Sequence, residues 1–113
     1  MTLRDTADQI IRASLRAVQP DAAVARALQS FSCSGRVVLI AIGKAAWRMA
    51  SAAAKALGEN LREGIVITKY GHSEGDIPRM TIYEAAHPIP DEAGVAATRA
   101  ALALADRMTA QDE

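Results

Sequence analysis

The 113-residue sequence predicts an α/β fold, with a layered, mostly parallel sheet and flanking helices. The run RVVLIAIG (residues 36–43) is almost continuously apolar and rich in β-branched residues, which is typical of a strand buried on both faces in a parallel sheet. Helical and strand patterns then alternate along the chain, as they do in α/β proteins. Half of the residues are hydrophobic, which is enough for one small core.

Two helices are predicted before this strand. Residues 3–18 carry apolar side chains at helical spacing, with arginines and aspartates on the opposite face. Thr2 is the expected N-cap, with Asp5 as a weak capping-box partner. Pro20 breaks this helix, and Asp21 is expected to cap a second one over residues 22–31.

Alternation continues after the strand. The sequence predicts a helix over residues 44–58, strands at Ile65–Thr68 and Met80–Ala85, a helix from about Asp91 to Met108, and a polar tail. Three strands are few for such a sheet, and the last helix ends where another strand is expected. Residues 1–113 are therefore interpreted as one segment, an incomplete part of a larger Rossmann-like domain.

Composition excludes several classes of protein. Lys plus Arg and Asp plus Glu number 13 each, so the charge gives no sign of a nucleic-acid or membrane partner. Cys33 is the only cysteine, which excludes a disulfide framework and fits a reducing cytoplasm. The longest apolar run is too short to span a bilayer, and the N-terminus has no signal core. We expect a soluble, cytoplasmic segment.

Polar stretches follow all three predicted strands, where ligands bind in open α/β sheets. The first, GKAA, contains Gly43 and Lys44 but is not a P-loop, because it lacks the glycine-rich cradle and the hydroxyl residue after the lysine. A lysine in the first turn of a helix can bind an anion together with the free N–H groups there. The alternative is a solvated lysine at a turn.

The second stretch, TKYGHSEG, combines Lys69 and His72 with Gly71, which allows a ligand to approach the backbone closely. A lysine can hold a phosphate or carboxylate as a point charge. The alternative is an ordinary surface loop with turn glycines.

The third stretch, EAAHPIPDEAG, is expected to be stiff and extended. Pro88 and Pro90 disfavour helical backbone in the residues before them, so His87 is held in a fixed direction. It could also be a rigid connector whose histidine only packs locally. Asp91 is placed mainly to cap the last helix, and Glu84, near the strand end, belongs either to the core edge or to the site. Two histidines without a carboxylate at ligand spacing predict no metal site.

These stretches, in this order, resemble the N-terminal part of the glycerate kinases that phosphorylate D-glycerate at its 2-hydroxyl, many of which are labelled hydroxypyruvate reductase. The matching segments are AIGKAAWRMA, GIVITKYGH and EAAHPIPDEAG, with the amphipathic N-terminal helix. The resemblance implies a two-domain protein whose large α/β domain opens the chain and whose smaller MOFRL domain closes it. It also implies that a strand and a Gly/Ser-rich loop come next.

The resemblance further implies the roles of the site residues. The lysine that matches Lys44 lies in the active-site cleft of the family, where positive charge assists phosphoryl transfer. Lys69, His72 and His87 are candidates for binding substrate, while Gly43, Gly71, Pro88, Pro90 and Asp91 shape the site. ATP and Mg²⁺ are expected for the complete enzyme, although no magnesium ligand set stands out here, and the chain alone is expected to be inactive.

Other functions remain open from the sequence. A hydroxypyruvate reductase requires a dinucleotide fingerprint, and no G-x-G-x-x-G occurs in this chain. A non-catalytic binding or assembly remnant would self-associate through an exposed sheet edge. A sugar-phosphate-binding domain of the isomerase type is a further alternative, which the HPIPDEAG segment does not suggest.

Overall fold

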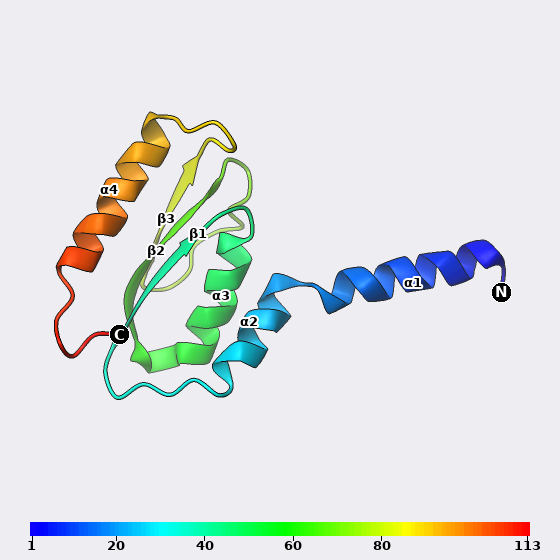
Figure 1. Cartoon of the computed structure of the whole chain (residues 1–113), viewed down its shortest axis with the longest axis horizontal. Helices are drawn as coiled ribbons and strands as arrows, with labels where there is room; N and C mark the ends of the chain where they lie inside the picture. The colour runs from blue at the N-terminus through cyan, green and yellow to red at the C-terminus, as the bar shows by residue number, and fades with distance from the viewer.

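The computed structural model describes all residues, 1–113, and has the predicted α/β architecture. Its sheet has the order β1-β2-β3, and both strand pairs are parallel. The elements are α1 (Leu3–Ala17), α2 (Pro20–Leu28), β1 (Val37–Ile42), α3 (Ala46–Leu57), a short 3₁₀ turn η1 (Gly58–Asn60), β2 (Leu61–Lys69), β3 (Met80–Ala85) and α4 (Glu92–Asp106). The helices α3 and α4 cover opposite faces of the sheet (Figure 1).

The core forms around β2, the central strand. Val66 is fully buried with Ala46 and Ala50 of α3 on one face. On the other face Ile65 and Ile67 pack against α4. The small side chains of these helices let their backbones lie close to the sheet, and both faces of β2 are dry. This explains why residues 65–67 of β2 are all apolar. The predicted burial on both faces is wrong for β1, because β1 is an outer strand of the sheet and is partly exposed.

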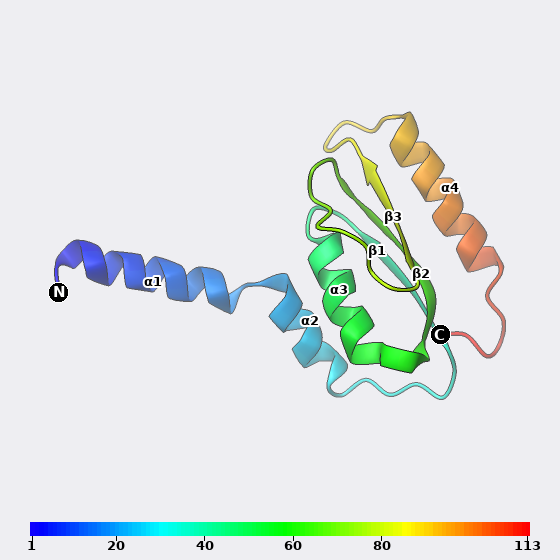
Figure 2. The same ribbon diagram turned by 180° about the vertical axis from the view of Figure 1, so that it is seen from behind.

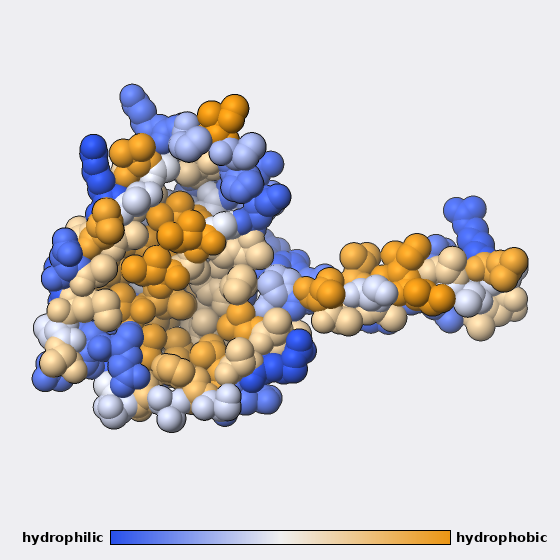
Figure 3. All heavy atoms as spheres, in the orientation of Figure 1, coloured by the Kyte–Doolittle hydropathy of each residue, from blue (hydrophilic) through white to orange (hydrophobic).

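The helix α1 has the predicted capping box. The Thr2 hydroxyl accepts a hydrogen bond from the Asp5 N–H, and the Asp5 carboxylate accepts one from the Thr2 N–H. No residue of α1 is buried, however, and the helix projects away from the rest of the molecule (Figures 1 and 2). Its apolar side, which includes Ile10 and Leu15, faces solvent (Figure 3). The pattern therefore predicted the helix correctly, whereas its apolar face has no partner within this chain.

Two helix starts differ from the predictions. Pro20 is the first residue of α2, and Gln19 is the N-cap, so Asp21 lies in the first turn and is not the cap. A proline at the first helical position loses no hydrogen bond, which is why it both follows α1 and begins α2. The helix α3 begins at Ala46, so Lys44 lies in the turn before the helix and not in its first turn.

The strand β2 is longer than its apolar segment. It begins at Leu61 and includes the charged Arg62 and Glu63, which the sequence pattern left out. The Arg62 guanidinium lies 3.2 Å from the Asp112 carboxylate, whose side chain is 1% exposed. Long-range ion pairs thus neutralise charges in a strand that local hydropathy does not identify.

The polar C-terminal tail is not a free tail. Residues 111–113 run parallel to the first residues of β1: the Arg36 N–H donates to the Gln111 carbonyl at 2.9 Å, and the Glu113 N–H donates to the Arg36 carbonyl at 2.8 Å. A Cβ atom at Gly35 would overlap the Gln111 carbonyl, so the close approach needs a glycine. The outer edge of β1 is therefore paired over its first residues, and the exposed edge expected from the sequence begins after Val38.

The close packing of β2 can be tested at Gly64. A Cβ atom there would overlap the Leu39 carbonyl oxygen and the Met80 side chain. We predict that Gly64→Ala lowers the free energy of unfolding by about 1–3 kcal/mol, the usual cost of overpacking. Urea denaturation followed by the fluorescence of Trp47 measures the change.

The control for this prediction is Gly94→Ala in α4. A Cβ atom at Gly94 would meet its neighbours at ordinary distances of 3.5 and 3.6 Å. Alanine also has a higher helix propensity than glycine, so this variant should be as stable as the original chain or more stable. Equal stability of the two variants would contradict the packing described for β2.

Candidate functional site

The turn between β1 and α3 presents Lys44 at the carboxyl end of the sheet. Gly43 has a φ of 128°, which favours glycine, and its carbonyl accepts a hydrogen bond from the buried Thr68 hydroxyl at 2.9 Å. Lys44 is exposed, and its ammonium forms no ion pair or hydrogen bond within the chain. Ala45, the N-cap of α3, provides no side-chain acceptor. Cationic and N–H donor groups therefore lie together at this turn.

The loop between β2 and β3 reaches back to the same turn. His72 Nδ1 lies 3.2 Å from the Lys44 carbonyl oxygen. Because a carbonyl only accepts hydrogen bonds, Nδ1 carries the proton in this contact and Nε2 remains free. Gly71 has a φ of 78°, and this turn brings the histidine towards Lys44.

Glu84, at the end of β3, holds this loop in place. Its carboxylate accepts hydrogen bonds from the Gly71 N–H at 3.1 Å and from the Ser73 N–H at 3.3 Å. The sequence left open whether Glu84 belongs to the core edge or to the site. In the structure it is half-buried and anchors the loop that carries His72.

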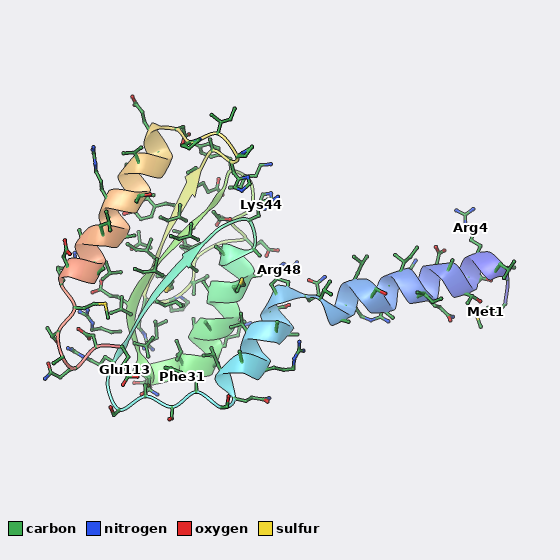
Figure 4. All side chains as sticks on the ribbon, viewed as in Figure 1. Met1, Arg4, Phe31, Lys44, Arg48 and Glu113 are labelled. Carbon is green, nitrogen blue, oxygen red and sulfur yellow. The ribbon has the colours of Figure 1, made fainter.

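An open pocket of about 590 Å³ lies between these loops and the start of α2. Residues predicted from the sequence line it together with others that were not: Gln19, Pro20, Lys44, Ala45, Arg48, Gly71, His72 and Glu74. Figure 4 shows Lys44 at the end of β1 and Arg48 on the adjoining turn of α3. Arg48 donates to the Glu74 carboxylate at 3.3 Å and to the Gln19 side-chain carbonyl at 3.1 Å. This network connects α2, α3 and the loop after β2.

Sequence reasoning missed Arg48, Glu74 and Gln19. Arg48 follows Lys44 by one helical turn, and this spacing could have identified it. Gln19 and Glu74 are far from Arg48 in the sequence and carried no such signal.

A second contact connects the loops after β2 and β3. The Tyr70 hydroxyl donates to one oxygen of Asp91 at 2.7 Å, and the other oxygen accepts from the Gly94 N–H at 3.0 Å. Asp91 is thus the N-cap of α4, as predicted, and also the acceptor for Tyr70. The hydrogen bond from Tyr70, followed by that from Gly94, lowers the pKa of Asp91, and the same bond to Asp91 raises the pKa of Tyr70.

The remaining candidates lie elsewhere at this end of the sheet. Lys69 is the last residue of β2, and its side chain has no ion-pair partner. His87 is exposed in a bend over residues 87–89, so the predicted extended course is wrong. Neither residue lines the pocket that contains Lys44. Pro90 lines a separate hollow of about 330 Å³ between β1 and α4.

Neither a metal cluster nor a membrane span occurs in this chain. No group of three or more His, Cys, Asp or Glu side chains is arranged to hold a metal ion. No helix has the length and apolar character needed to cross a bilayer.

Comparison with known proteins identifies the family. The model of the family described as a domain of unknown function (DUF4147) matches residues 6–113. The chain belongs to this family. A protein of Thermotoga maritima named D-glycerate 2-kinase is 49% identical over 111 residues, which is 98% of this chain and 26% of the relative. A glycerate 2-kinase of Pyrococcus horikoshii is 31% identical over 99% of this chain and 27% of the relative.

One solved structure and one further relative are also similar to this chain. The crystal structure of a glycerate kinase from Thermotoga maritima superposes with a TM-score of 0.87 and 48% identity, covering 97% of this chain and 26% of that one. A protein of Agrobacterium vitis with the provisional name of hydroxypyruvate reductase is 35% identical over 86% of this chain and 22% of the relative. The chain thus spans about a quarter of the relatives it matches, and the resemblance to the N-terminal part of glycerate kinases is confirmed.

The contact between Tyr70 and Asp91 makes stability depend on pH. The pKa of Asp91 is lowered, so its contribution is present above the unfolded value of about 3.9 and is lost as the pH falls through the lower folded value. The pKa of Tyr70 is raised, so its contribution is present below about pH 10 and is lost as the pH rises through the higher folded value. We predict that Tyr70→Phe lowers the free energy of unfolding most between about pH 5 and 9.

Urea denaturation at a series of pH values measures this difference. The control is Tyr83→Phe, which removes a hydroxyl from β3 beside the α4 cluster without affecting Asp91. A difference between the original chain and Tyr70→Phe that is the same at pH 3, 7 and 11 would contradict the assignment.

Proposed function

We propose that this chain is the N-terminal portion of the large α/β domain of a glycerate kinase. In the complete protein, the γ-phosphoryl group of ATP is transferred to the 2-hydroxyl of D-glycerate. The observation that carries the proposal is the cationic pocket at the carboxyl end of β1, in a chain 49% identical to a D-glycerate 2-kinase along nearly its whole length. The 113 residues alone are inactive in this proposal, because they correspond to about a quarter of that relative.

Charge is the chemical reason for assigning the site to the turn after β1. Glycerate carries a carboxylate and ATP carries phosphates, and both need cationic or N–H partners. The Lys44 ammonium has no partner within the chain, and the start of α3 adds unsatisfied N–H groups. Lys44 therefore stabilises the negative charge on the transferred phosphoryl group or on the substrate carboxylate.

Three further side chains, those of His72, Lys69 and His87, bind and orient the substrate in this proposal. His72 Nε2 is free to accept a hydrogen bond from a substrate hydroxyl, because Nδ1 is held by the Lys44 carbonyl. Lys69 is the last residue of β2 and His87 follows β3, and in this proposal both contact parts of the substrate further from Lys44. Gly43 and Gly71 provide the turns, while Asp91, Pro88 and Pro90 shape the third loop.

The proposal includes Mg²⁺ for the complete enzyme and assigns no Mg²⁺ ligands to this chain. The carboxylate of Glu84 is occupied by two N–H groups and that of Glu74 by Arg48, so these residues do not form a ligand set. Mg²⁺ commonly binds one or two carboxylates together with substrate phosphates. The carboxylates would come from the rest of the protein, and no step is assigned to the ion here.

Location and partners follow from the same proposal. The lone, half-buried Cys33 and the small-molecule substrates fit a cytoplasmic enzyme without nucleic-acid or membrane partners. Self-association through the outer edge of β1 is the proposed behaviour of the chain when that edge is left uncovered.

The test is a chimera in which this chain replaces the first quarter of the Thermotoga maritima kinase. We expect ATP consumption that depends on D-glycerate. Lys44→Ala should lower kcat/KM by about 100- to 1,000-fold, the usual cost of losing one charge-stabilising donor. A folded chimera that consumes no ATP would refute the proposed function.

The matched control is Lys55→Ala, which removes a lysine from the last turn of α3, the helix that follows Lys44. This variant should keep near-original kcat/KM, and circular dichroism should show all three proteins folded. Equal activity of Lys44→Ala and Lys55→Ala would remove Lys44 from the mechanism and leave the family assignment intact.

Hydride transfer to hydroxypyruvate is the second candidate, favoured by the provisional name of the Agrobacterium vitis relative. Oxidation of NADH with hydroxypyruvate, in the absence of ATP, would support it. We expect none, since this chain has no dinucleotide fingerprint.

A further inference from the structure

Arg48 has hydrogen-bond donors that the fold leaves unused. A guanidinium has five N–H groups, and in Arg48 the Nε group donates to the Glu74 carboxylate at 3.3 Å and Nη1 to the Gln19 side-chain oxygen at 3.1 Å. Three N–H groups, two of them on Nη2, therefore have no partner within the chain. Half of the side chain is exposed, and it lines the same pocket as Lys44 (Figure 4). These donors are available to a ligand in that pocket.

The direction of this guanidinium is fixed by its neighbours. The Gln19 amide nitrogen donates to a carbonyl in the last turn of α1 at 3.3 Å, which leaves the amide oxygen to accept from Arg48. Glu74 lies in the loop after β2, and the next residue, Gly75, accepts a hydrogen bond from Trp47 Nε1 at 2.8 Å. The arginine is thus held between α2 and this loop before any ligand binds. Such preorganisation lowers the entropic cost of binding.

The unused donors suit a carboxylate better than a triphosphate. A guanidinium presents its N–H groups in one plane, which matches the planar carboxylate. The Glu74 carboxylate, 3.3 Å from Nε, neutralises part of the charge of Arg48 and repels a polyanion more strongly than a singly charged group. Lys44 has no ion-pair partner within the chain, so its full charge is available to a phosphoryl group.

We propose that Arg48 binds the carboxylate of D-glycerate through its free N–H groups, while Lys44 binds the phosphoryl group that is transferred. This division of roles rests on the proposed function. It gives separate tasks to the lysine and the arginine that line the pocket. In the substrate, the carboxylate carbon is bonded directly to the carbon that carries the 2-hydroxyl, so one pocket holds both groups at the same time.

The assignment makes Arg48 a specificity-determining residue. The carboxylate is not the reacting group, so its contact is present both before and during the transfer, and losing it raises KM more than it lowers kcat. Lys44 contacts the group on which the charge changes, so its loss lowers kcat. If Arg48 only held α2 and the loop after β2 in place, its effect would not depend on the charge of the substrate.

The experiment compares D-glycerate with D-glyceramide, in which an uncharged amide replaces the carboxylate, as substrates of the chimera. Arg48→Met removes the donors and the charge but keeps much of the length of the side chain. We expect it to lower kcat/KM for D-glycerate by about 10- to 100-fold, mainly through KM, as for loss of a hydrogen bond to a charged group. The loss for D-glyceramide should be at least about fivefold smaller, because hydrogen bonds to a neutral amide are weaker.

Two further variants are the controls. Arg26→Ala removes an exposed arginine from the last turn of α2, outside the pocket, and should change kcat/KM for either substrate by less than about twofold. Lys44→Ala should lower kcat equally for both substrates, because the transferred phosphoryl group is the same. Circular dichroism shows whether each variant is folded. If Arg48→Met does not fold, Arg48→Gln takes its place, since its amide can still donate to Glu74.

Two kinetic results would overturn the assignment. Equal losses for both substrates in the Arg48 variant would make Arg48 a structural support only. A loss confined to D-glycerate in Lys44→Ala would assign the carboxylate to Lys44 instead.

Calorimetric titration of the chimera with each compound measures the same preference without turnover. A folded chimera that consumes no ATP, but binds D-glycerate more tightly than D-glyceramide only when Arg48 is present, would refute the proposed function and support the carboxylate site. A chimera that phosphorylates D-glycerate and shows no such preference would overturn the site and leave the proposed function intact.

Discussion

Burial of β2 on both faces is the interaction on which the rest of the structure depends. Val66 packs against α3, while Ile65 and Ile67 pack against α4, so one strand holds both helical layers. Because it is central, β2 also fixes the register of β1 and β3. Gly64 extends this constraint to the start of the strand, where only a glycine lets the backbone approach Leu39 and Met80. The functional end of the sheet is positioned by this arrangement.

The parallel alignment of the strands gathers chemistry that is dispersed in the sequence. Lys44 follows β1, His72 follows β2 and Asp91 follows β3, and all three loops lie at the carboxyl ends of the parallel strands. Hydrogen bonds then order the loops: Glu84 holds the loop that carries His72, and Tyr70 connects that loop with Asp91. The carboxylates that hold these loops are bound by backbone N–H groups and by Tyr70, whereas the Lys44 ammonium has no hydrogen-bond or ion-pair partner within the chain.

Most of the fold could be predicted from the sequence, for physical reasons visible in particular elements. The capping box of Thr2 and Asp5 and the cap at Asp91 are local, so short-range residue patterns identify them. The apolar, β-branched run identified β1 as a strand, but β1 is an outer strand of the sheet and Ile40 and Ile42 are exposed, so the predicted burial on both faces is wrong. Predictions failed where distant residues decide: Arg62 and Glu63 belong to β2 because the charges on Asp112 and Arg107 neutralise them. Pro20 was predicted only to end the first helix, but it also begins α2, because a proline fits both after a helix and at the first position of one.

The sequence by itself determined the order of helices and strands, the α/β class and the position of Lys44 at a strand end, because these depend on the periodicity and type of neighbouring residues. Only the tertiary structure decided which candidates share a pocket. Lys44 and His72 do, together with the unexpected Arg48, whereas Lys69 and His87 do not. It also decided that the polar tail pairs with β1. The reason is that contacts between residues far apart in the sequence depend on how the strands align. The pattern of neighbouring residues does not specify that alignment.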